Sequence, residues 1–200
     1  MMTLSKINLL RLYFKDKYST AEIAKIFKCS ENKINYWLAK YKIKKRSISE
    51  AIYTKNNSDG DPFEIKKLKT GRDIELFNLG VGLFLGEGTK KIKSTVVLAN
   101  SNPKILKLFL KFLREICGIN EGKIRAALNV FDDIDIKGAI NFWSEVTGIH
   151  ISRFGKTMVR KSKGGTYKNR SEYGTLTLYV SNTKLKTLMD EWCKNALNRY

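Results

Sequence analysis

Apolar residues in the first 55 positions recur at the three- and four-residue spacing of amphipathic helices. Helices are predicted over residues 3–15, 20–27, 30–41 and 47–54. On the first of these, Ile7, Leu10 and Phe14 share one face. The second begins with a capping box, because Ser19 and Glu22 are three positions apart. The pattern predicts a small helical bundle.

The second part of the chain alternates helical and strand-like patterns. Helices are predicted over residues 72–86, 103–117, 137–147 and 183–197. Strands are predicted over residues 94–100, 123–130, 156–160 and 174–181. Gly148 is a natural stop for the third of these helices. The alternation predicts an α+β domain.

Between the two patterns lies Asn-Asn-Ser-Asp-Gly-Asp-Pro at residues 56–62, where polar turn-forming residues gather beside one of the two prolines of the chain. We place the domain boundary here. The expected organisation is a helical domain over residues 1–55, a linker with a short basic lead-in helix over 56–70, and a second domain over 71–200.

The net charge of the chain indicates the kind of partner that it binds. The 38 Lys and Arg residues outnumber the 19 Asp and Glu residues, which gives a formal net charge of +19 shared by both halves. Such an excess favours a polyanionic partner, because basic side chains release the counterions condensed on nucleic acid. Solubility alone is the plainer explanation, although it does not require so one-sided a balance. We therefore expect the partner to be double-stranded DNA.

Several other classes of protein are disfavoured. Cys29, Cys117 and Cys193 are widely separated, and His150 is the only histidine, so the chain lacks the ligand spacing of a zinc finger. The longest apolar run, residues 76–86, is too short to span a bilayer. We expect a cytoplasmic protein that associates with the nucleoid when bound to DNA, with no membrane partner and no small-molecule cofactor.

The second and third predicted helices, joined by the short turn Lys28-Cys29-Ser30, resemble a helix-turn-helix module. The family pattern is carried by Ile34-Asn35-Tyr36-Trp37-Leu38 and a basic tail, although Lys42 stands where many relatives have glycine. The resemblance places four side chains in the major groove: Asn32, Lys33, Asn35 and Tyr36. It places three more on phosphates: Lys44, Lys45 and Arg46. An ordinary helical bundle with solvated charges is the alternative.

A glycine-rich segment follows the linker, Leu79-Gly80-Val81-Gly82-Leu83-Phe84-Leu85-Gly86-Glu87-Gly88. Gly82 and Gly86 are four apart and share one helical face, which lets another backbone approach closely. Glu87 falls at the C-terminal end of the predicted helix, where the macrodipole disfavours a carboxylate and a bound cation would offset the cost. The segment therefore suggests a pair of helices about a two-fold axis that brings two carboxylates together.

This segment resembles the motif of the LAGLIDADG homing endonucleases, whose Ala-Gly-Leu-Ile-Asp-Ala-Asp-Gly aligns with residues 81–88. The chain departs from the motif at Leu85, where the family has a non-catalytic acid. The resemblance implies a saddle-shaped domain with an antiparallel sheet, and a homodimer, because there is one copy of the motif. It implies a Mg²⁺ site at Gly86 and Glu87, with Glu87 catalytic. The implied dimer interface comprises Leu79, Gly82, Leu83 and Gly86.

The remaining site predictions concern basic residues around the implied saddle. A basic residue near the metal usually stabilises the transition state of such nucleases, and we assign this catalytic role to Lys156. Contacts to DNA phosphates are predicted for Lys90, Lys123, Arg125, Arg160, Lys161, Lys163, Lys168 and Arg170.

Three interpretations of the second domain follow. The first is a homing-type, Mg²⁺-dependent endonuclease that cleaves a partly palindromic DNA site. The second keeps the fold without cleavage, because bacterial sporulation-type transcription regulators resemble the same family and pair such a domain with a helix-turn-helix. The third is a buried glycine-rich helix on which Glu87 is an ordinary surface residue.

Overall fold

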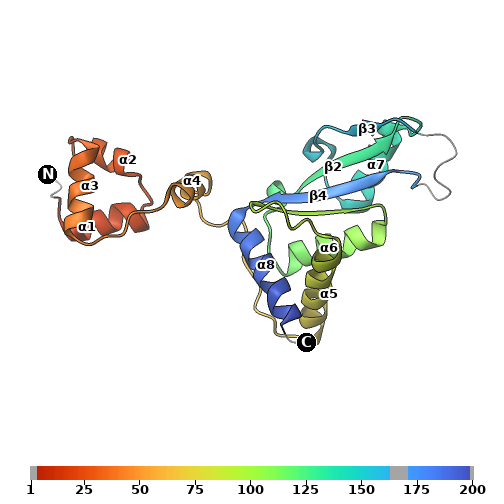
Figure 1. Ribbon diagram of the computed structural model, residues 1–200, viewed down its shortest axis with the longest axis horizontal. Coiled ribbons are helices and arrows are strands. Elements are labelled where there is room, and N and C mark those ends of the chain that lie inside the picture. The colour runs from red at the N-terminus through yellow and green to blue at the C-terminus, as the bar shows by residue number, and fades with distance from the viewer. Residues whose placement is uncertain (1–3, 163–170, 199–200) are drawn as a thin grey trace. The chain divides into compact units, whose positions relative to one another are not determined.

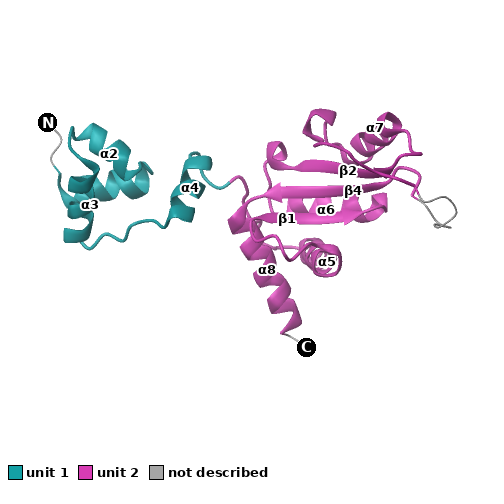
Figure 2. Ribbon diagram, turned by 45° about the horizontal axis from the view of Figure 1, so that its top comes forward, with its two compact units in different colours: residues 1–61 teal, residues 62–200 magenta. Residues whose placement is uncertain are grey.

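The computed structural model describes residues 4–162 and 171–198. The chain divides into two compact units, Met1–Asp61 and Pro62–Tyr200, which Figure 2 shows in teal and magenta. The described residues form a mixed α+β structure with eight α-helices and one four-stranded sheet. None of the helices found among them is both long enough and apolar enough to cross a lipid bilayer.

The first unit contains four α-helices and one π-helical turn. They are α1 (Lys6–Leu10), the π-helix η1 (Arg11–Lys15) that continues it, α2 (Thr20–Ile26), α3 (Glu31–Lys40) and α4 (Ile48–Asn56) (Figure 1). A serine begins each α-helix by accepting a backbone N–H from the first turn; these serines are Ser5, Ser19, Ser30 and Ser47. The capping box predicted at Ser19 is present.

The core of this unit does not use the predicted face of the first helix. Ile7, Leu10 and Phe14 are 78%, 37% and 52% exposed, whereas Leu9 and Leu12 are buried against the other helices. Both sets of positions have helical spacing, so the periodicity offered two apolar faces. The segment also ends as a π-helix, in which each turn holds an extra residue and rotates the following side chains.

The second unit alternates helices and strands. Its elements are α5 (Gly71–Glu87), β1 (Thr95–Asn100), α6 (Pro103–Glu115), the 3-10 turn η2 (Glu121–Lys123), β2 (Arg125–Phe131), α7 (Ile136–Thr147), the 3-10 turn η3 (Ile151–Arg153), β3 (Met158–Arg160), β4 (Thr175–Ser181) and α8 (Thr183–Leu197). Gly148 ends α7 in the left-handed conformation, as predicted.

The four strands form one sheet in the order β1-β4-β2-β3. Strand β4 runs antiparallel to β1 and β2, but β3 runs parallel to β2. The sheet is therefore mixed, and the expected purely antiparallel sheet is wrong. The reason is the connection from β2 to β3, in which α7 returns the chain to the end of the sheet where β2 began, and such a crossover gives parallel pairing.

One face of the sheet is covered and the other is open. Alternate residues along β1, β2 and β4 are buried in the core of the unit, together with apolar side chains of α5, α6, α7 and α8. In Figure 1, α5, α6 and α8 lie on the same side of the sheet. The intervening positions, which include Arg125, Asn129 and Thr177, are exposed or half-buried.

Residues 62–70 do not form the predicted basic helix. They run extended, and their backbone pairs with the loop after α6 through Asn120 N to Pro62 O (2.9 Å) and Lys66 N to Ile116 O (2.8 Å). Gly118 is required at this approach, because a Cβ there would lie 2.3 Å from the carbonyl oxygen of Glu64. The segment belongs to the second unit, and tertiary hydrogen bonds outweigh its local helical pattern.

Candidate nucleic-acid and metal site

Helix α5 carries the glycine-rich segment and begins at a capping box. Thr70 accepts the N–H of Asp73, and Asp73 accepts the N–H of Thr70 in return. Lys66 Nζ donates to Asp73 Oδ1 at 2.7 Å, and this hydrogen bond is the main reason that the pKa of Asp73 falls from 3.8 to about 2. The start of the helix is therefore fixed by the extended segment before it.

The glycines of α5 differ in what surrounds them. A Cβ at Gly80 would lie 2.1 Å from the ring of Phe112, so Gly80 is the point where α5 packs closely on α6. A Cβ at Gly82 or Gly86 would meet no other described atom within 4 Å. Within the described part of the chain, therefore, packing does not require glycine at either position.

The predicted interface residues fall into two groups. Leu79 is 45% exposed and shares the outward face of α5 with Gly82 and Gly86. Leu83 instead packs against the core of the unit. Beside Gly82, an open groove of about 410 Å³ runs between α5 and α8 and is lined by Phe77, Val81 and Trp192, among others. The outward face of α5 thus consists of two glycines without side chains, Gly82 and Gly86, and one exposed leucine, Leu79.

Glu87 is the last residue of α5 and is exposed. The backbone that follows it is bound to the edge strand, because Gly88 bridges Leu98 and Thr89 N donates to Val97 O at 2.9 Å. A Cβ at Gly88 would lie 2.3 Å from the ring of Phe84, so only glycine fits at this position. The carboxylate therefore stands on backbone that is held by both the helix and the sheet.

The ammonium of Lys90 caps the same helix end. Its Nζ donates to the carbonyl oxygens of Phe84 (2.6 Å), Leu85 (2.5 Å) and Gly88 (2.9 Å). Within the chain Lys90 binds backbone carbonyls, and its contact to DNA stays a prediction. A carboxylate at a helix C-terminus is disfavoured by the macrodipole, and the Lys90 ammonium supplies a positive charge that offsets this cost.

The structure separates Lys156 from Glu87 within one chain. One row of paired residues crosses the sheet from edge to edge: Gly88, Leu98, Leu178, Ala126 and Phe154. Neighbouring strands lie about 4.8 Å apart, so the four steps of this row span roughly 19 Å. Lys156 follows Phe154 at the far edge, while Glu87 precedes Gly88 at the near edge. The predicted pairing of these two residues is therefore absent from a single chain.

The donor set for a metal is small. Among the described residues, no three His, Cys, Asp or Glu side chains gather where an ion would be held. Mg²⁺ takes oxygen ligands, often one or two protein carboxylates together with waters and substrate phosphates. One exposed carboxylate per chain fits that chemistry only in a shared site, to which a second chain and DNA contribute further oxygens. Glu87, with Gly86 beside it, is an exposed carboxylate of this kind.

In the first unit, the predicted groove-binding residues lie on α3 with different exposures. Asn32 and Lys33 are exposed, and Tyr36 is 60% exposed. Asn35 is half-buried, and its Oδ1 is buried without a hydrogen-bond partner among the described atoms. Lys42 adopts a positive φ of 56° and takes the left-handed position after α3 that glycine usually fills. The helix therefore ends as it does in sequences with glycine there.

The basic tail of this unit is divided between solvent and structure. Lys44 and Lys45 are exposed. Arg46 is half-buried; its guanidinium donates to the carbonyl oxygens of Lys17 (3.2 Å) and Tyr18 and lies 4.2 Å from the centre of the Tyr13 ring. Arg46 therefore holds the loop before α2, and its contact to a phosphate stays a prediction.

Two basic residues of the second unit lie on the open face of the sheet, level with opposite ends of β2. Arg125 and Arg160 are exposed at register positions of that face, in β2 and β3. Lys123 in η2 and Lys161 after β3 are exposed nearby in the sequence. The predicted contacts at Lys163, Lys168 and Arg170 lie outside the described residues.

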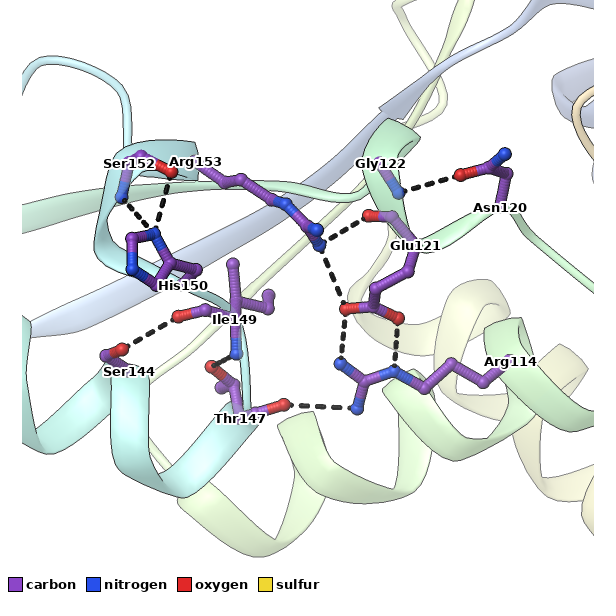
Figure 3. Close-up of polar contacts among 10 residues, drawn as sticks. All are labelled: Arg114, Asn120, Glu121, Gly122, Ser144, Thr147, Ile149, His150, Ser152 and Arg153. Carbon is purple, nitrogen blue, oxygen red and sulfur yellow. Dashed lines mark hydrogen bonds and ion pairs between the residues drawn. The ribbon is translucent and has the colours of Figure 1, made fainter.

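The start of β2 is held by a cluster around Glu121 (Figure 3). Arg114 binds both carboxylate oxygens, at 2.9 and 2.8 Å, and Arg153 donates to the Glu121 backbone carbonyl at 2.7 Å. The guanidinium of Arg114 is the largest cause that lowers the pKa of Glu121. His150 begins η3 by accepting the N–H of Ser152, as a structural histidine would. Arg114 also donates to Thr147 O at 3.1 Å, so the cluster joins α6, α7 and η3.

Comparison adds no relative. No protein-family model, curated protein or solved structure matches the chain significantly. Functional inference therefore depends on the residues and geometry described above.

Sequence reasoning missed one side chain near the end of α5. Lys186 of α8 is fully buried, and its Nζ binds both oxygens of Asp190 at 2.5 Å and lies 5.6 Å from the centre of the Phe84 ring. The only available signal was the spacing, because Lys186 and Asp190 are four apart on a helix. Two ammonium groups, Lys90 and Lys186, therefore flank the ring of Phe84 just before Glu87.

Proposed function

We propose that the protein is a sequence-specific double-stranded DNA endonuclease of the homing type. In this proposal the first unit is a helix-turn-helix that reads the major groove. The second unit is a LAGLIDADG-like saddle that works as a homodimer. Glu87 from each subunit meets at the dimer axis, with Gly86 beside it, and Mg²⁺ is the expected cofactor.

One observation carries the proposal: α5 presents two bare glycines to solvent and ends in an exposed carboxylate. Each glycine in a helix interior costs roughly 1 kcal/mol relative to alanine, and no described neighbour in the chain requires Gly82 or Gly86. A second α5 packed on this face would explain both glycines. It would also bring two Glu87 side chains together.

DNA contact is supported by charge and placement. The chain carries a net charge of +19. In the second unit, Arg125 and Arg160 lie on the face of the sheet that no helix covers, and in the first unit Asn32 and Lys33 are exposed on α3. Phosphate contacts position a protein on the duplex, whereas base-edge contacts specify its sequence. We assign the first role to the sheet and the second to α3.

In the proposed reaction, Glu87 of each subunit would hold the metal through its carboxylate. A bound Mg²⁺ supplies Lewis-acid activation of the phosphate and of the attacking water. The chain itself contributes the fixed backbone of Glu87, the close approach permitted by Gly82 and Gly86, and the basic face that orients the duplex. Lys156 would act on a phosphate at the opposite edge of the sheet rather than beside Glu87.

A DNA-binding transcription regulator that does not cleave is the alternative, and two observations favour it. Lys90 already supplies a positive charge to the end of α5, so Glu87 does not require a metal for electrostatic balance. Glu115 ends α6 in the same way. An acid at a helix C-terminus is therefore not special in this chain.

The two functions are separated by a cleavage assay on a DNA site that the protein binds. The assay compares wild type, Glu87→Gln and the matched control Glu115→Gln, with Mg²⁺ and with chelator. The nuclease predicts Mg²⁺-dependent cutting by wild type and by the control, and a loss of several orders of magnitude in Glu87→Gln with binding retained. Equal cutting by all three proteins would remove Glu87 from the mechanism. No cutting of a bound site would establish the regulator.

A further inference from the structure

We infer that Lys90 is the positioning residue of the Glu87 site, because its ammonium fixes the helix end on which the carboxylate stands. The inference depends on the proposed function, since it assigns Lys90 a role in that reaction. It concerns a residue that contacts neither DNA nor metal in the proposal and acts only through the backbone of α5.

The contact set at Lys90 matches the chemistry of a lysine. An ammonium has three N–H donors and no acceptor, and Lys90 Nζ lies 2.5–2.9 Å from three carbonyl oxygens, those of Phe84, Leu85 and Gly88. Two of these carbonyls belong to the last turn of α5, where carbonyl groups run out of N–H partners from the helix; that of Phe84 also accepts the N–H of Gly88. The third follows Glu87. The ammonium therefore joins the residues before and after the carboxylate.

Other contacts hold the groups around Lys90 in place. The Phe84 ring is fully buried and lies 5.4 Å from Lys90 Nζ. Gly88 N donates to Phe84 O at 2.9 Å, and Thr89 is bound to β1. Lys90 Nζ bridges the carbonyl oxygens of Leu85 and Gly88, and this bridge is lost when the ammonium is removed. The end of α5 can then fray, and the direction of Glu87 changes with it.

The geometry also predicts which substitutions will fail. Lys90→Met keeps the length of the side chain but removes all three donors. Lys90→Arg keeps the charge but spreads its donors over a planar fork, which does not match three carbonyls around one nitrogen. Lys91→Met is the matched control, because Lys91 is the exposed neighbour and loses the same charge.

Two measurements test the inference. Amide hydrogen exchange at Gly88 and Thr89 reports whether the helix end is held, with or without enzymatic activity. Single-turnover cleavage at saturating DNA, titrated with Mg²⁺, reports the consequence for the reaction. Displacement of a catalytic group by about 1 Å can cost on the order of 100-fold in rate, so Lys90→Met should cleave about 10- to 100-fold more slowly. Its DNA affinity should match that of Lys91→Met.

Three results together would support the role. Lys90→Met shows faster exchange and slower cleavage, Lys90→Arg shows partial recovery of both, and Lys91→Met shows neither change. Unchanged exchange, or cleavage equal to that of the control, would overturn it. If Lys90→Met does not fold, Lys90→Arg should show the same two changes at smaller size. A wild-type protein that binds DNA and does not cleave it would contradict the proposed nuclease. The exchange data would still show whether Lys90 holds the end of α5.

Discussion

Substitution of single glycines in α5 by alanine should have opposite effects at two positions that are only two residues apart. Gly80→Ala places a methyl group 2.1 Å from the ring of Phe112, which is fully buried, so the packing between α5 and α6 must shift. Gly82→Ala places the same methyl group in open space. The two variants share a helix and a chemical change, so their difference isolates packing from helix propensity.

The magnitudes follow from two terms. Alanine is favoured over glycine inside a helix by about 1 kcal/mol, and this gain applies to both variants. Overpacking a full core costs typically about 1–3 kcal/mol or more, and only Gly80→Ala carries that cost. We expect Gly82→Ala to stabilise the isolated chain by about 1 kcal/mol. We expect Gly80→Ala to destabilise it by up to about 2 kcal/mol.

Assembly reverses the advantage of Gly82→Ala. If the outward face of α5 packs on a second α5, a methyl group at residue 82 keeps the two backbones apart, and Gly82→Leu does so more strongly. The variant should then raise the dimer dissociation constant while it raises the stability of the monomer. Sedimentation over a range of concentrations measures the first effect, and chemical unfolding at the lowest concentration measures the second.

The outcomes separate the two arguments. A Gly82→Ala chain less stable than wild type at monomer concentrations would show that other atoms of the same chain fill the space around Gly82, which is open in the structure. An unchanged dimer in Gly82→Leu would remove this face from the interface. A monomeric wild type on DNA would contradict the homodimer as a whole.

Three further predictions concern charge. Binding to duplex DNA should weaken steeply between about 50 and 200 mM salt; Lys44→Ala and Lys45→Ala should each reduce the slope of log K against log salt by about 1, and a flat dependence would contradict a phosphate-binding role. Arg46→Ala should instead lower the melting temperature of the first unit, because the Arg46 guanidinium holds two loop carbonyls. An unchanged melting temperature would contradict this structural role. The free energy of unfolding should decrease as pH falls from about 4 through 2, because the pKa of Asp73 is lowered from 3.8 to about 2 in the folded chain. The Asp73 carboxyl stabilises the fold only while it is ionised. In Asp73→Asn, this pH-dependent loss of stability should be absent from an acid titration of unfolding.

The sequence predicted the helices and strands well where local chemistry decides them. Serine caps at Ser19 and Ser30 and the glycine stop at Gly148 mark element ends directly, and the predicted bounds of α8 match the structure. Predictions failed where a tertiary partner decides. The segment after Pro62 is extended because it pairs with a distant loop, and β3 is parallel because α7 crosses over the sheet.

The candidate site was predictable in its residues but less so in their contacts. Glycine spacing and the position of Glu87 are properties of one helix, so the sequence contains them. Lys90 and Arg46 look like any other basic residue in a chain with 38 of them. Only the fold reveals that their donors meet backbone carbonyls. The distance between Lys156 and Glu87 likewise depends on strand order, which periodicity does not determine.

The extended segment before α5 changes where the second unit can be cut as a separate fragment. A fragment that begins at residue 71 would look complete by its helices. It would lack the partners of Ile116 O and Asn120 N and the lysine that binds Asp73. A fragment that begins at Pro62 keeps all three, so the structural unit starts nine residues before its first helix.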